Sequence, residues 1–482
     1  MTHTIDKALT RNPVSSEDIA YFASAGIEMI HSDNKLEDRF NADMFDKYFG
    51  DSQLALFPKT AQQVSTILAY CNEHQISVVT QGGNSGVAGG AIAHNGEVIL
   101  SLRDMNKVRE IDSVAGVIVA ESGCVLEDLD NFVQEHGFIM PVDLGGRKRC
   151  MIGGNVSTSA GGLRYLRYGS MHANVLGLEV VLPDGRILDA LFSLKKDASG
   201  YDIKQLFIGA EGTLGVVTAV SISLAPKPRS SQIAVLGLNE FSKIHRAFVL
   251  ARQNLGEIVS AFEFWEKRCN EIVVEFEKYD SPLDRDHEFY VMIETRGSVV
   301  SHDAEKMDMF LECLQDEGIV DESRVFSESE AMAAVWLFRS QMASAHTKSG
   351  CMYVYDFSLP PKHQYDLLVA TKQHMTALGL YGNDDSPIKD ITEFGHVGDQ
   401  NLHLQVIARE FGGAVEAALE PWIYEWVGSH GGSVAAEHGL GAHKGKFLKY
   451  SKSPVVIQTM KDIKQMFDPR GIMNPGKHIS CA

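Results

Sequence analysis

The stretch "QGGNSGVAGGA", residues 81–91, puts five glycines into eleven positions. It follows an apolar, strand-like run, "ISVVT" at 76–80, and a helix-like segment, "AQQVSTILAYCNEHQ" at 61–75. Glycine lets backbone amides come close to a ligand, and successive amides in turns form anion-binding concavities. A helix, a buried strand and a glycine loop in this order predict a phosphate-binding loop, although one such loop alone is equally consistent with ordinary turns.

A second glycine cluster, "CMIGGNVSTSAGG" at 150–162, also lies among strand-like runs. Two clusters suit a long anionic ligand such as a dinucleotide better than two unrelated turns. Neither cluster reads GxGxxG, and neither is a Walker A loop. The sequence therefore supports neither a Rossmann nicotinamide site nor a P-loop.

The segments around the clusters alternate between strand and helix patterns. "EVILSL" (97–102), "GVIVAESG" (116–123) and "LGLEVVLPDGRILDA" (176–190) predict strands, and "LEDLDNFVQEHG" (126–137) predicts a helix. A Pro-Lys-Pro at 226–228 is a plausible domain boundary. Beyond it, "EFYVMIET" and "MYVYDFSL" predict strands and "AEKMDMFLECLQDE" an amphipathic helix. A chain of 482 residues suggests two or three domains.

Charge and cysteine usage limit the class of protein. A net charge of −19, spread along the chain, disfavours nucleic acid and anionic membranes as partners. No run has the length of a membrane span, and the first residues lack the apolar core of a secretion signal. The seven cysteines, Cys481 among them, form no CxxC pair. This argues for free thiols in a reducing compartment and against a thiolate zinc site or an iron–sulfur cluster.

Two histidines stand out in "FGHVGDQNLHLQV", residues 394–406. The glycines and Asp399 predict a turn that carries His396, and the alternation that follows predicts a strand with His403 and Gln405 on one face. Glu437 lies farther on, in "AAEHGLG" at 435–441. Two imidazoles and a carboxylate are a normal set for a catalytic zinc with an open position, and Asp399 could support one imidazole from behind. The residues alone leave open that these are surface histidines and a solvated Glu.

Two further side chains are candidates for chemistry. His438 could act as a general base, because imidazole titrates near neutral pH. Arg339, in "VWLFRSQM", could hold a substrate carboxylate by a two-pronged contact, or it could belong to a solvated helix face.

Taken together, these motifs resemble one family. Besides the two glycine clusters and the histidine segments, the resemblance rests on "FIMPVDLG", "LKKDASGYDIKQLFIGAEGTLG", "SAFEFWE" and the closing "MNPGKHI". It extends from about residue 13 to 478. The chain resembles the flavin-dependent D-2-hydroxy acid dehydrogenases of the vanillyl-alcohol-oxidase fold, and among them most the D-2-hydroxyglutarate dehydrogenases.

The resemblance implies an α+β fold with a PCMH-type FAD-binding domain of two subdomains over 1–227. An α+β substrate domain with an antiparallel sheet would follow at 228–432, and 433–482 would complete the FAD domain and active site. FAD should be non-covalent, because the first glycine loop contains no histidine. The residues implied in FAD binding are Gly82, Gly83, Asn84, Ser85, Gly86, Gly89, Gly90, Pro141, Leu144, Gly145, Ile152, Gly153, Gly154, Ser157, Thr158, Gly161, Gly162, Glu211, Gly215, Val216 and Asn474.

The resemblance also assigns the reacting side chains. His396, His403 and Glu437 match residues that bind zinc or a similar divalent ion, and His438 matches the base. The substrate-binding positions are Arg339, Ala343, Val354 and Gln405. Three of them depart from the hydroxyglutarate pattern, which has Thr, Lys and Asn where this chain has Ala343, Val354 and Gln405. The loss of a cation and a hydroxyl should weaken binding of a second carboxylate, at about 1.5–3 kcal/mol for a charge-assisted contact.

The expected activity is metal-assisted oxidation of a D-2-hydroxy acid, first D-2-hydroxyglutarate, to the 2-oxo acid by hydride transfer to flavin N5. D-lactate or another less acidic D-acid is the alternative. The electrons would leave to an electron-transfer flavoprotein, a quinone or a 2-oxo acid. Other classes are an oxygen-using oxidase, a flavin-dependent transferase or a silent FAD-binding protein. The expected compartment is the cytoplasm or mitochondrial matrix, with a soluble protein, and a homodimer stays open.

Overall fold

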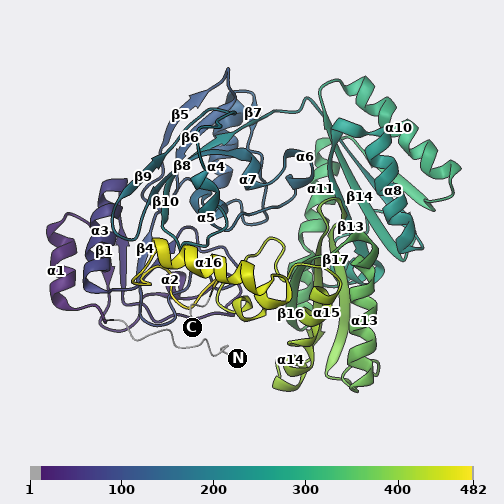
Figure 1. Ribbon diagram of the computed structural model, residues 1–482. Coiled ribbons are helices and arrows are strands. Elements are labelled where there is room, and N and C mark those ends of the chain that lie inside the picture. The colour runs from purple at the N-terminus through teal and green to yellow at the C-terminus, as the bar shows by residue number, and fades with distance from the viewer. Residues whose placement is uncertain (1–11, 480–482) are drawn as a thin grey trace. The chain divides into compact units, whose positions relative to one another are not determined.

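The computed structural model describes residues 12–479, so Cys481 and the start of the chain lie outside it. The chain forms two compact units (Figure 1). The first contains residues up to 162, 169–227 and those from 437 onward, and the second contains 163–168 and 228–436. Residues 163–168, which fall inside the predicted range 1–227, pack in the second unit. Within the described residues, no helix is long and apolar enough to cross a membrane.

The first unit contains a four-stranded sheet that presents the first glycine cluster. Its strand order is β1 (Glu28–His31), β2 (Leu54–Phe57), β4 (Val98–Ser101) and β3 (Val78–Gln81). β3 and β4 are parallel, and the helix α3 (Ala61–His74) connects β2 to β3. Thr60 caps α3 with its side chain, and the apolar positions of the helix are buried against this sheet. The glycine loop begins where β3 ends. Shorter elements here are α1 (Ser16–Ser24) and α2 (Asp38–Asn41).

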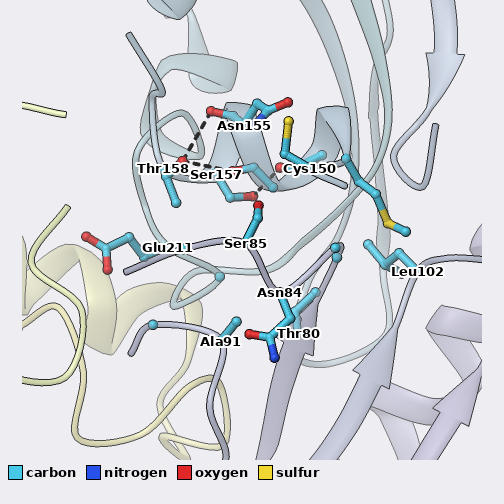
Figure 2. A pocket seen from close by; sticks show the side chains of 18 of the residues that line it. Thr80, Asn84, Ser85, Ala91, Leu102, Cys150, Asn155, Ser157, Thr158 and Glu211 are labelled. Atoms are coloured by element: carbon cyan, nitrogen blue, oxygen red, sulfur yellow. Dashed lines mark hydrogen bonds between the residues drawn. The ribbon is translucent and has the colours of Figure 1, made fainter. Parts of the chain in front are cut away.

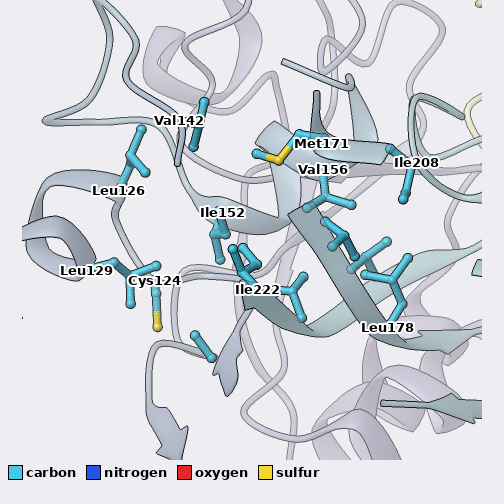
Figure 3. Packing of buried hydrophobic residues seen from close by; sticks show 14 of the residues in the cluster. Cys124, Leu126, Leu129, Val142, Ile152, Val156, Met171, Leu178, Ile208 and Ile222 are labelled. Carbon is cyan, nitrogen blue, oxygen red and sulfur yellow. The ribbon is translucent and has the colours of Figure 1, made fainter. Parts of the chain in front are cut away.

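A five-stranded antiparallel sheet forms the other half of the first unit. Its order is β5 (Val108–Asp112), β6 (Val117–Glu121), β10 (Val216–Ser223), β8 (Val175–Val181) and β9 (Ile187–Ala190). Figure 3 shows its core, where Ile222 and Leu178 pack with Ile152 and Val156 of α5 (Ile152–Ser157). This core fixes the helix that carries the second glycine cluster. The remaining elements here are α4 (Leu126–Glu135), β7 (Phe138–Ile139), α7 (Met171–Asn174), η1 (Ile203–Leu206) and β11 (Ala225–Pro226).

The C-terminal segment returns to the first unit. It contains η5 (Lys444–Tyr450) and α16 (Pro454–Phe467), drawn in yellow in Figure 1. Met473 then pairs with Val78 as a parallel bridge, so the tail extends the four-stranded sheet beyond β3. Ile472 and Met473 are fully buried in the core of that sheet.

The second unit is built on one seven-stranded antiparallel sheet. Its order is β15 (Glu322–Phe326), β12 (Ser230–Leu238), β14 (Phe289–Gly297), β13 (Val259–Glu266), β17 (Ile388–His396), β18 (Asn401–Ala408) and β16 (Cys351–Ser358). The sheet confirms the antiparallel arrangement expected for the substrate domain. β17 and β18 are joined by the short turn η4 (Val397–Asp399).

Helices cover both faces of this sheet. One face packs Trp265 and Phe394 against α9 (Lys267–Glu277), α11 (Ser329–Ser340) and α12 (Met342–Ser349). The other face packs Phe262 and Phe264 against α8 (Phe241–Asn254). The remaining elements are α6 (Tyr165–Tyr168), η2 (Gly256–Ile258), α10 (Val300–Asp316), η3 (Pro361–His363), α13 (Gln364–Ala377), α14 (Gly413–Leu419) and α15 (Trp422–Ser429).

The expected turn at 394–406 differs from the structure in one position. His396 is the last residue of β17 and not part of the turn, because its backbone still pairs with Asn401. His403 lies on β18 as predicted. Since side chains alternate along a strand, His396 and His403 both face the side of the sheet that bears Phe394, toward α11 and α12.

Candidate active site

A pocket in the first unit is lined by both glycine clusters (Figure 2). Ser85, from the loop after β3, lies beside Ser157 of α5 in this view. The two clusters approach through Gly83: a Cβ there would lie 1.8 Å from the carbonyl oxygen of Arg149. The Arg149 Nε in turn donates to the Gly83 carbonyl at 2.7 Å. Only glycine permits this approach, so the spacing of the first cluster has a direct structural cause.

The pocket has room for a ligand along exposed backbone. A Cβ added at Gly86 or Gly154 would meet no atom of the chain within 4 Å, and both residues line the pocket. Backbone without side chains in front of it can be approached closely by a phosphate group. The bare backbone at these two glycines therefore fits the phosphate groups of FAD.

The structure brings about half of the predicted cofactor residues to this pocket. The lining contains Gly82, Gly83, Asn84, Ser85, Gly86, Gly90, Gly153, Gly154, Ser157, Thr158, Glu211 and Gly215. The lining does not include Gly89, Pro141, Leu144, Gly145, Ile152, Gly161, Gly162, Val216 and Asn474.

Several of the predicted cofactor residues outside the lining have a structural role in the first unit. Ile152 and Val216 are completely buried in separate hydrophobic clusters of the first unit. A Cβ at Gly89 would lie 2.8 Å from the ring of Tyr48, so Gly89 packs under that ring. Asn474 donates through its amide to the carbonyl oxygens of Gly90 and Glu211, at 3.0 and 2.7 Å. Asn474 thus holds the loops of the pocket and does not line it.

The pocket also contains residues that the sequence motifs did not single out. Val217 lines it in place of Val216, since neighbouring strand residues face opposite sides. Thr80 and Ser122 could have been predicted from the sequence, because each lies at the end of a strand-like run. The others are Ala88, Ala91, Leu102, Cys150, Met151, Asn155 and Gly212.

His438 and Glu437 belong to the same unit as this pocket. His438 lines the pocket, and its Nε2 lies 3.6 Å from Oε1 of Glu437. The other oxygen of Glu437 accepts a hydrogen bond from the Gly162 amide at 3.1 Å. The predicted base therefore lies at the wall of the predicted flavin pocket, with its neighbour anchored to the second glycine cluster.

The predicted histidine ligands meet on the sheet of the second unit. The Nε2 atoms of His396 and His403 are 3.3 Å apart, and both side chains are buried. Two nitrogens that each lie about 2.0–2.1 Å from a tetrahedral ion are roughly 3.3–3.4 Å apart. The separation of the two imidazoles therefore fits a shared metal ion.

The buried carboxylate of Glu263 contacts the nitrogen of His396 that does not face His403. Glu263 accepts from Nδ1 of His396 at 2.8 Å, which directs the Nε2 lone pair of a neutral ring toward His403. Burial opposes the charge on Glu263, but His396 and Arg339 outweigh it and hold the pKa of the carboxyl below its ordinary value. The sequence suggested Asp399 as the residue that could support a ligand imidazole. In the structure, Asp399 accepts a hydrogen bond from the Asn401 amide in the turn. The available signal was the acidic position in the middle of the apolar strand "SAFEFWE".

Arg339 reaches the same carboxylate. Its Nη2 donates to Oε2 of Glu263 at 2.8 Å, and its guanidinium lies over the ring of Phe394 at 4.7 Å. The side chain is buried, so the solvated-helix alternative for Arg339 is wrong. Within residues 12–479, its Nε has no hydrogen-bond partner. The guanidinium therefore retains a donor for a ligand.

The remaining substrate positions lie on neighbouring elements. Val354 on β16 pairs with Gln405 on β18, and Gln405 faces the same side of the sheet as His403. Gln405 is 2% exposed, and its Oε1 has no hydrogen-bond partner in the described part of the chain. Ala343 is partly buried in the first turn of α12. The predicted set of His396, His403 and Glu437 is divided between the two units, so its assembly stays a prediction.

Known protein families match both halves of the chain. Residues 52–191 match "FAD binding domain", and residues 227–478 match "FAD linked oxidases, C-terminal domain". The D-2-hydroxyglutarate–pyruvate transhydrogenase of Saccharomyces cerevisiae is 44% identical over 97% of this chain and 96% of its own. The mitochondrial D-2-hydroxyglutarate dehydrogenase of Danio rerio is 43% identical over 97% of this chain and 86% of its own. This chain belongs to the FAD-dependent D-2-hydroxy acid dehydrogenases.

Two further similarities refine the place of this dehydrogenase. A provisionally named mitochondrial D-lactate dehydrogenase of Schizosaccharomyces pombe is 44% identical over 92% of this chain and 84% of its own. Among solved structures, p-cresol methylhydroxylase superposes with a TM-score of 0.74 at 16% identity, covering 98% of this chain and 99% of its own. The superposition confirms the predicted PCMH-type α+β fold of the dehydrogenase, and the FAD binding domain confirms FAD as its cofactor.

Proposed function

We propose that the protein oxidises a D-2-hydroxy acid, with D-2-hydroxyglutarate as first choice, in a reaction assisted by zinc or a similar divalent ion. The observation that carries the metal is the 3.3 Å separation of the His396 and His403 Nε2 atoms, with Glu263 behind His396. Glu437 is the proposed third ligand. Ala436, the residue before it, donates its amide to Asp356 at 3.2 Å, and Asp356 pairs with His403 across the strands. The chain therefore leaves the second unit beside the histidine pair.

The chain's own residues bind and orient the substrate. Arg339 has a buried guanidinium with an unused donor, which suits a carboxylate. Gln405 offers an amide on the histidine face of the sheet. Unpaired polar atoms in a buried site are costly, and a polar ligand that pairs with them removes that cost.

The oxidation removes a hydride from C2 and a proton from the hydroxyl, and leaves the 2-oxo acid. His438 takes the hydroxyl proton. A metal held by His396, His403 and Glu437 would supply polarisation of the substrate hydroxyl, and FAD held by the two glycine clusters would supply the two-electron hydride acceptor, at N5. Non-covalent attachment of FAD is supported by the absence of histidine from the loop 81–91.

The electrons must then leave the flavin to an acceptor. The name of the yeast relative includes pyruvate as a second substrate, which favours a 2-oxo acid over an electron-transfer flavoprotein or a quinone. The names of the zebrafish and fission-yeast relatives favour the mitochondrial matrix over the cytoplasm.

D-lactate is the second candidate substrate. Val354 and Ala343 place apolar side chains where the hydroxyglutarate pattern has Lys and Thr, so the second carboxylate loses two polar partners. The fission-yeast relative carries a D-lactate name. A smaller substrate with one carboxylate needs only Arg339 and the metal.

The test is anaerobic mixing of the yellow protein with a panel of D- and L-2-hydroxy acids, followed by the loss of flavin absorbance. We expect bleaching by D-2-hydroxyglutarate and not by its L-isomer. Bleaching by D-lactate alone would support the second candidate, and no bleaching by any 2-hydroxy acid would overturn the proposed function. Peroxide release in air at the rate of turnover would instead identify an oxidase.

A further inference from the structure

The carboxylate of Glu211 contacts three groups of the C-terminal segment. Oε1 accepts from the Leu440 amide at 2.7 Å, and Oε2 accepts from the Gly441 amide at 2.8 Å. Nδ1 of His478 adds a third contact at 2.9 Å. In Figure 2 the carboxylate of Glu211 points toward the yellow C-terminal ribbon. The family resemblance implied a role for Glu211 in FAD binding; Glu211 lines the pocket, and its carboxylate contacts its own chain.

The segment that Glu211 holds has no regular structure of its own. Residues 434–440 belong to no helix or strand. The two glycines around Leu440 permit the contact. A Cβ at Gly439 would lie 2.6 Å from Oε1 of Glu211, and one at Gly441 would lie 1.9 Å from the Ala88 carbonyl oxygen. Glu211 and the first glycine loop therefore contact this segment around Leu440, and the Gly162 amide contacts it at Glu437.

Glu211 is itself held by a further hydrogen bond. Glu211 adopts a left-handed backbone conformation with φ of +51°, and its carbonyl oxygen accepts from the Asn474 amide at 2.7 Å. Burial disfavours charge on Glu211, yet His478 and the two backbone amides outweigh it and keep its pKa below the ordinary value. A buried charged acceptor with three donors forms strong hydrogen bonds.

We propose that Glu211 is the positioning residue for His438: it holds the segment 439–441 so that the imidazole two residues away stays at the wall of the flavin pocket. This inference rests on the proposed role of His438 as the base. The three contacts of the Glu211 carboxylate go to the chain itself, so Glu211 acts through the placement of His438.

The test compares Glu211→Gln with Glu211→Asp in protein loaded with FAD. A glutamine replaces one acceptor oxygen by an NH2 group that faces a backbone N–H. Because a displacement of about 1 Å can cost about 100-fold in rate, we expect flavin reduction by the best 2-hydroxy acid to slow about 10- to 100-fold, with the flavin-to-protein ratio unchanged. Glu211→Asp keeps the charge and should be slowed less. Asp130→Asn, which alters a buried acceptor of the Met140 amide in the same unit, is the matched control.

A double-mutant cycle separates positioning from a general structural effect. If Glu211 acts through His438, Glu211→Gln should cost almost nothing in a His438→Ala background, because the two changes remove one function. Equal losses in both backgrounds would overturn the proposal, and so would loss of FAD in proportion to activity.

A readout without substrate keeps the inference separate from the proposed function. The visible circular dichroism of bound flavin reports the side chains around it. We expect Glu211→Gln to change this spectrum in the same way as His438→Ala, and the double variant to add nothing. An unchanged spectrum in Glu211→Gln, beside a changed one in His438→Ala, would overturn the positioning role even if no 2-hydroxy acid bleaches the wild type.

Discussion

Glu263 joins two side chains that the proposed reaction uses differently. One oxygen accepts from a proposed metal ligand, His396, and the other accepts from the proposed substrate arginine, Arg339, each at 2.8 Å. A single buried carboxylate therefore fixes the ring that binds the ion and the guanidinium that binds the acid. A change at this residue should affect metal affinity as well as turnover.

Replacing Glu263 by glutamine should weaken metal binding about 10- to 100-fold, the usual effect of losing a carboxylate behind a histidine ligand. Competition with a chelator measures this affinity without any turnover. Glu393→Gln is the control, because Glu393 is an equally buried carboxyl on β17 that alternates to the opposite face of the sheet. Metal affinity in Glu263→Gln equal to that of the wild type would contradict the supporting role.

Val354 offers a second test, of substrate preference. Lysine at this position, combined with Ala343→Thr, restores the cation and hydroxyl of the hydroxyglutarate pattern. A charge-assisted contact of roughly 1.5–3 kcal/mol should raise the ratio of kcat/KM for D-2-hydroxyglutarate over D-lactate about 10- to 100-fold. Met352→Lys, on the same face of β16 but one row farther from His403, should leave the ratio unchanged. A ratio that does not move in the Val354 variant would show that the second carboxylate binds elsewhere.

At the scale of the elements, α12 is joined to the sheet by a buried histidine. His346 on α12 contacts the Met342 carbonyl through Nδ1 and the Thr392 hydroxyl of β17 through Nε2, at 2.6 and 3.0 Å. Burial lowers the pKa of His346 from 6.5 to about 4. The neutral ring is thus part of the packing between α12 and the strand that ends in His396.

This burial predicts a loss of stability in acid. Between pH 6.5 and 4 the unfolded chain binds a proton at His346 that the folded chain does not, so stability is complete above pH 6.5 and falls as the pH drops toward 4. His346 alone should account for roughly 3 kcal/mol at the acid end. Urea unfolding at pH 7.5 and 4.5 measures this, and His346→Gln should reduce the pH dependence. The exposed His302→Gln is the control, and an equal pH dependence in wild type and His346→Gln would contradict the prediction.

The strands and helices were the easiest part to predict, because their patterns are local. "AQQVSTILAYCNEHQ" predicts α3 to within one residue, and "LGLEVVLPDGRILDA" predicts both β8 and β9. The position of His396 was wrong because glycine at 395 indicates a turn, whereas the β-ladder with β13 and β18 continues through it. The pairing of β17 with β13 joins residues more than a hundred positions apart. The contact between Glu263 and His396 spans the same distance along the chain.

The site was predictable in its residue types and less so in its geometry. The glycine positions followed from close backbone approach, and Gly83 and Gly153 have that explanation. The sequence could not show that Glu211 and Asn474 hold the loops of the pocket in place, since their contacts join residues more than 200 positions apart along the chain. The local pattern identifies which residue types matter, and the topology decides which atoms they touch.

At the scale of the whole molecule, the chain crosses between its two units and returns. Residues after 436 belong again to the first unit, where Met473 bridges to Val78 of β3. Lys477 donates to the carbonyl oxygen of Gly90 at 3.2 Å and to the side-chain oxygen of Asn474 at 2.7 Å. The tail therefore supports the loop that is expected to bind the FAD phosphates. The second unit, in contrast, contains every tryptophan of the chain: Trp265, Trp336, Trp422 and Trp426.

This division makes a truncation informative. A chain that ends at residue 436 retains the whole second unit and loses the tail that extends the four-stranded sheet and fixes the glycine loop. We expect the truncated protein to be colourless after purification in excess FAD, because Asn474, Lys477 and the 438–441 segment no longer hold the pocket. Its tryptophan emission and urea midpoint should stay close to those of the full chain, since these signals come from the second unit. Flavin bound at the full stoichiometry would contradict the dependence of the pocket on the tail, and a tryptophan spectrum of unfolded protein would contradict the independence of the second unit.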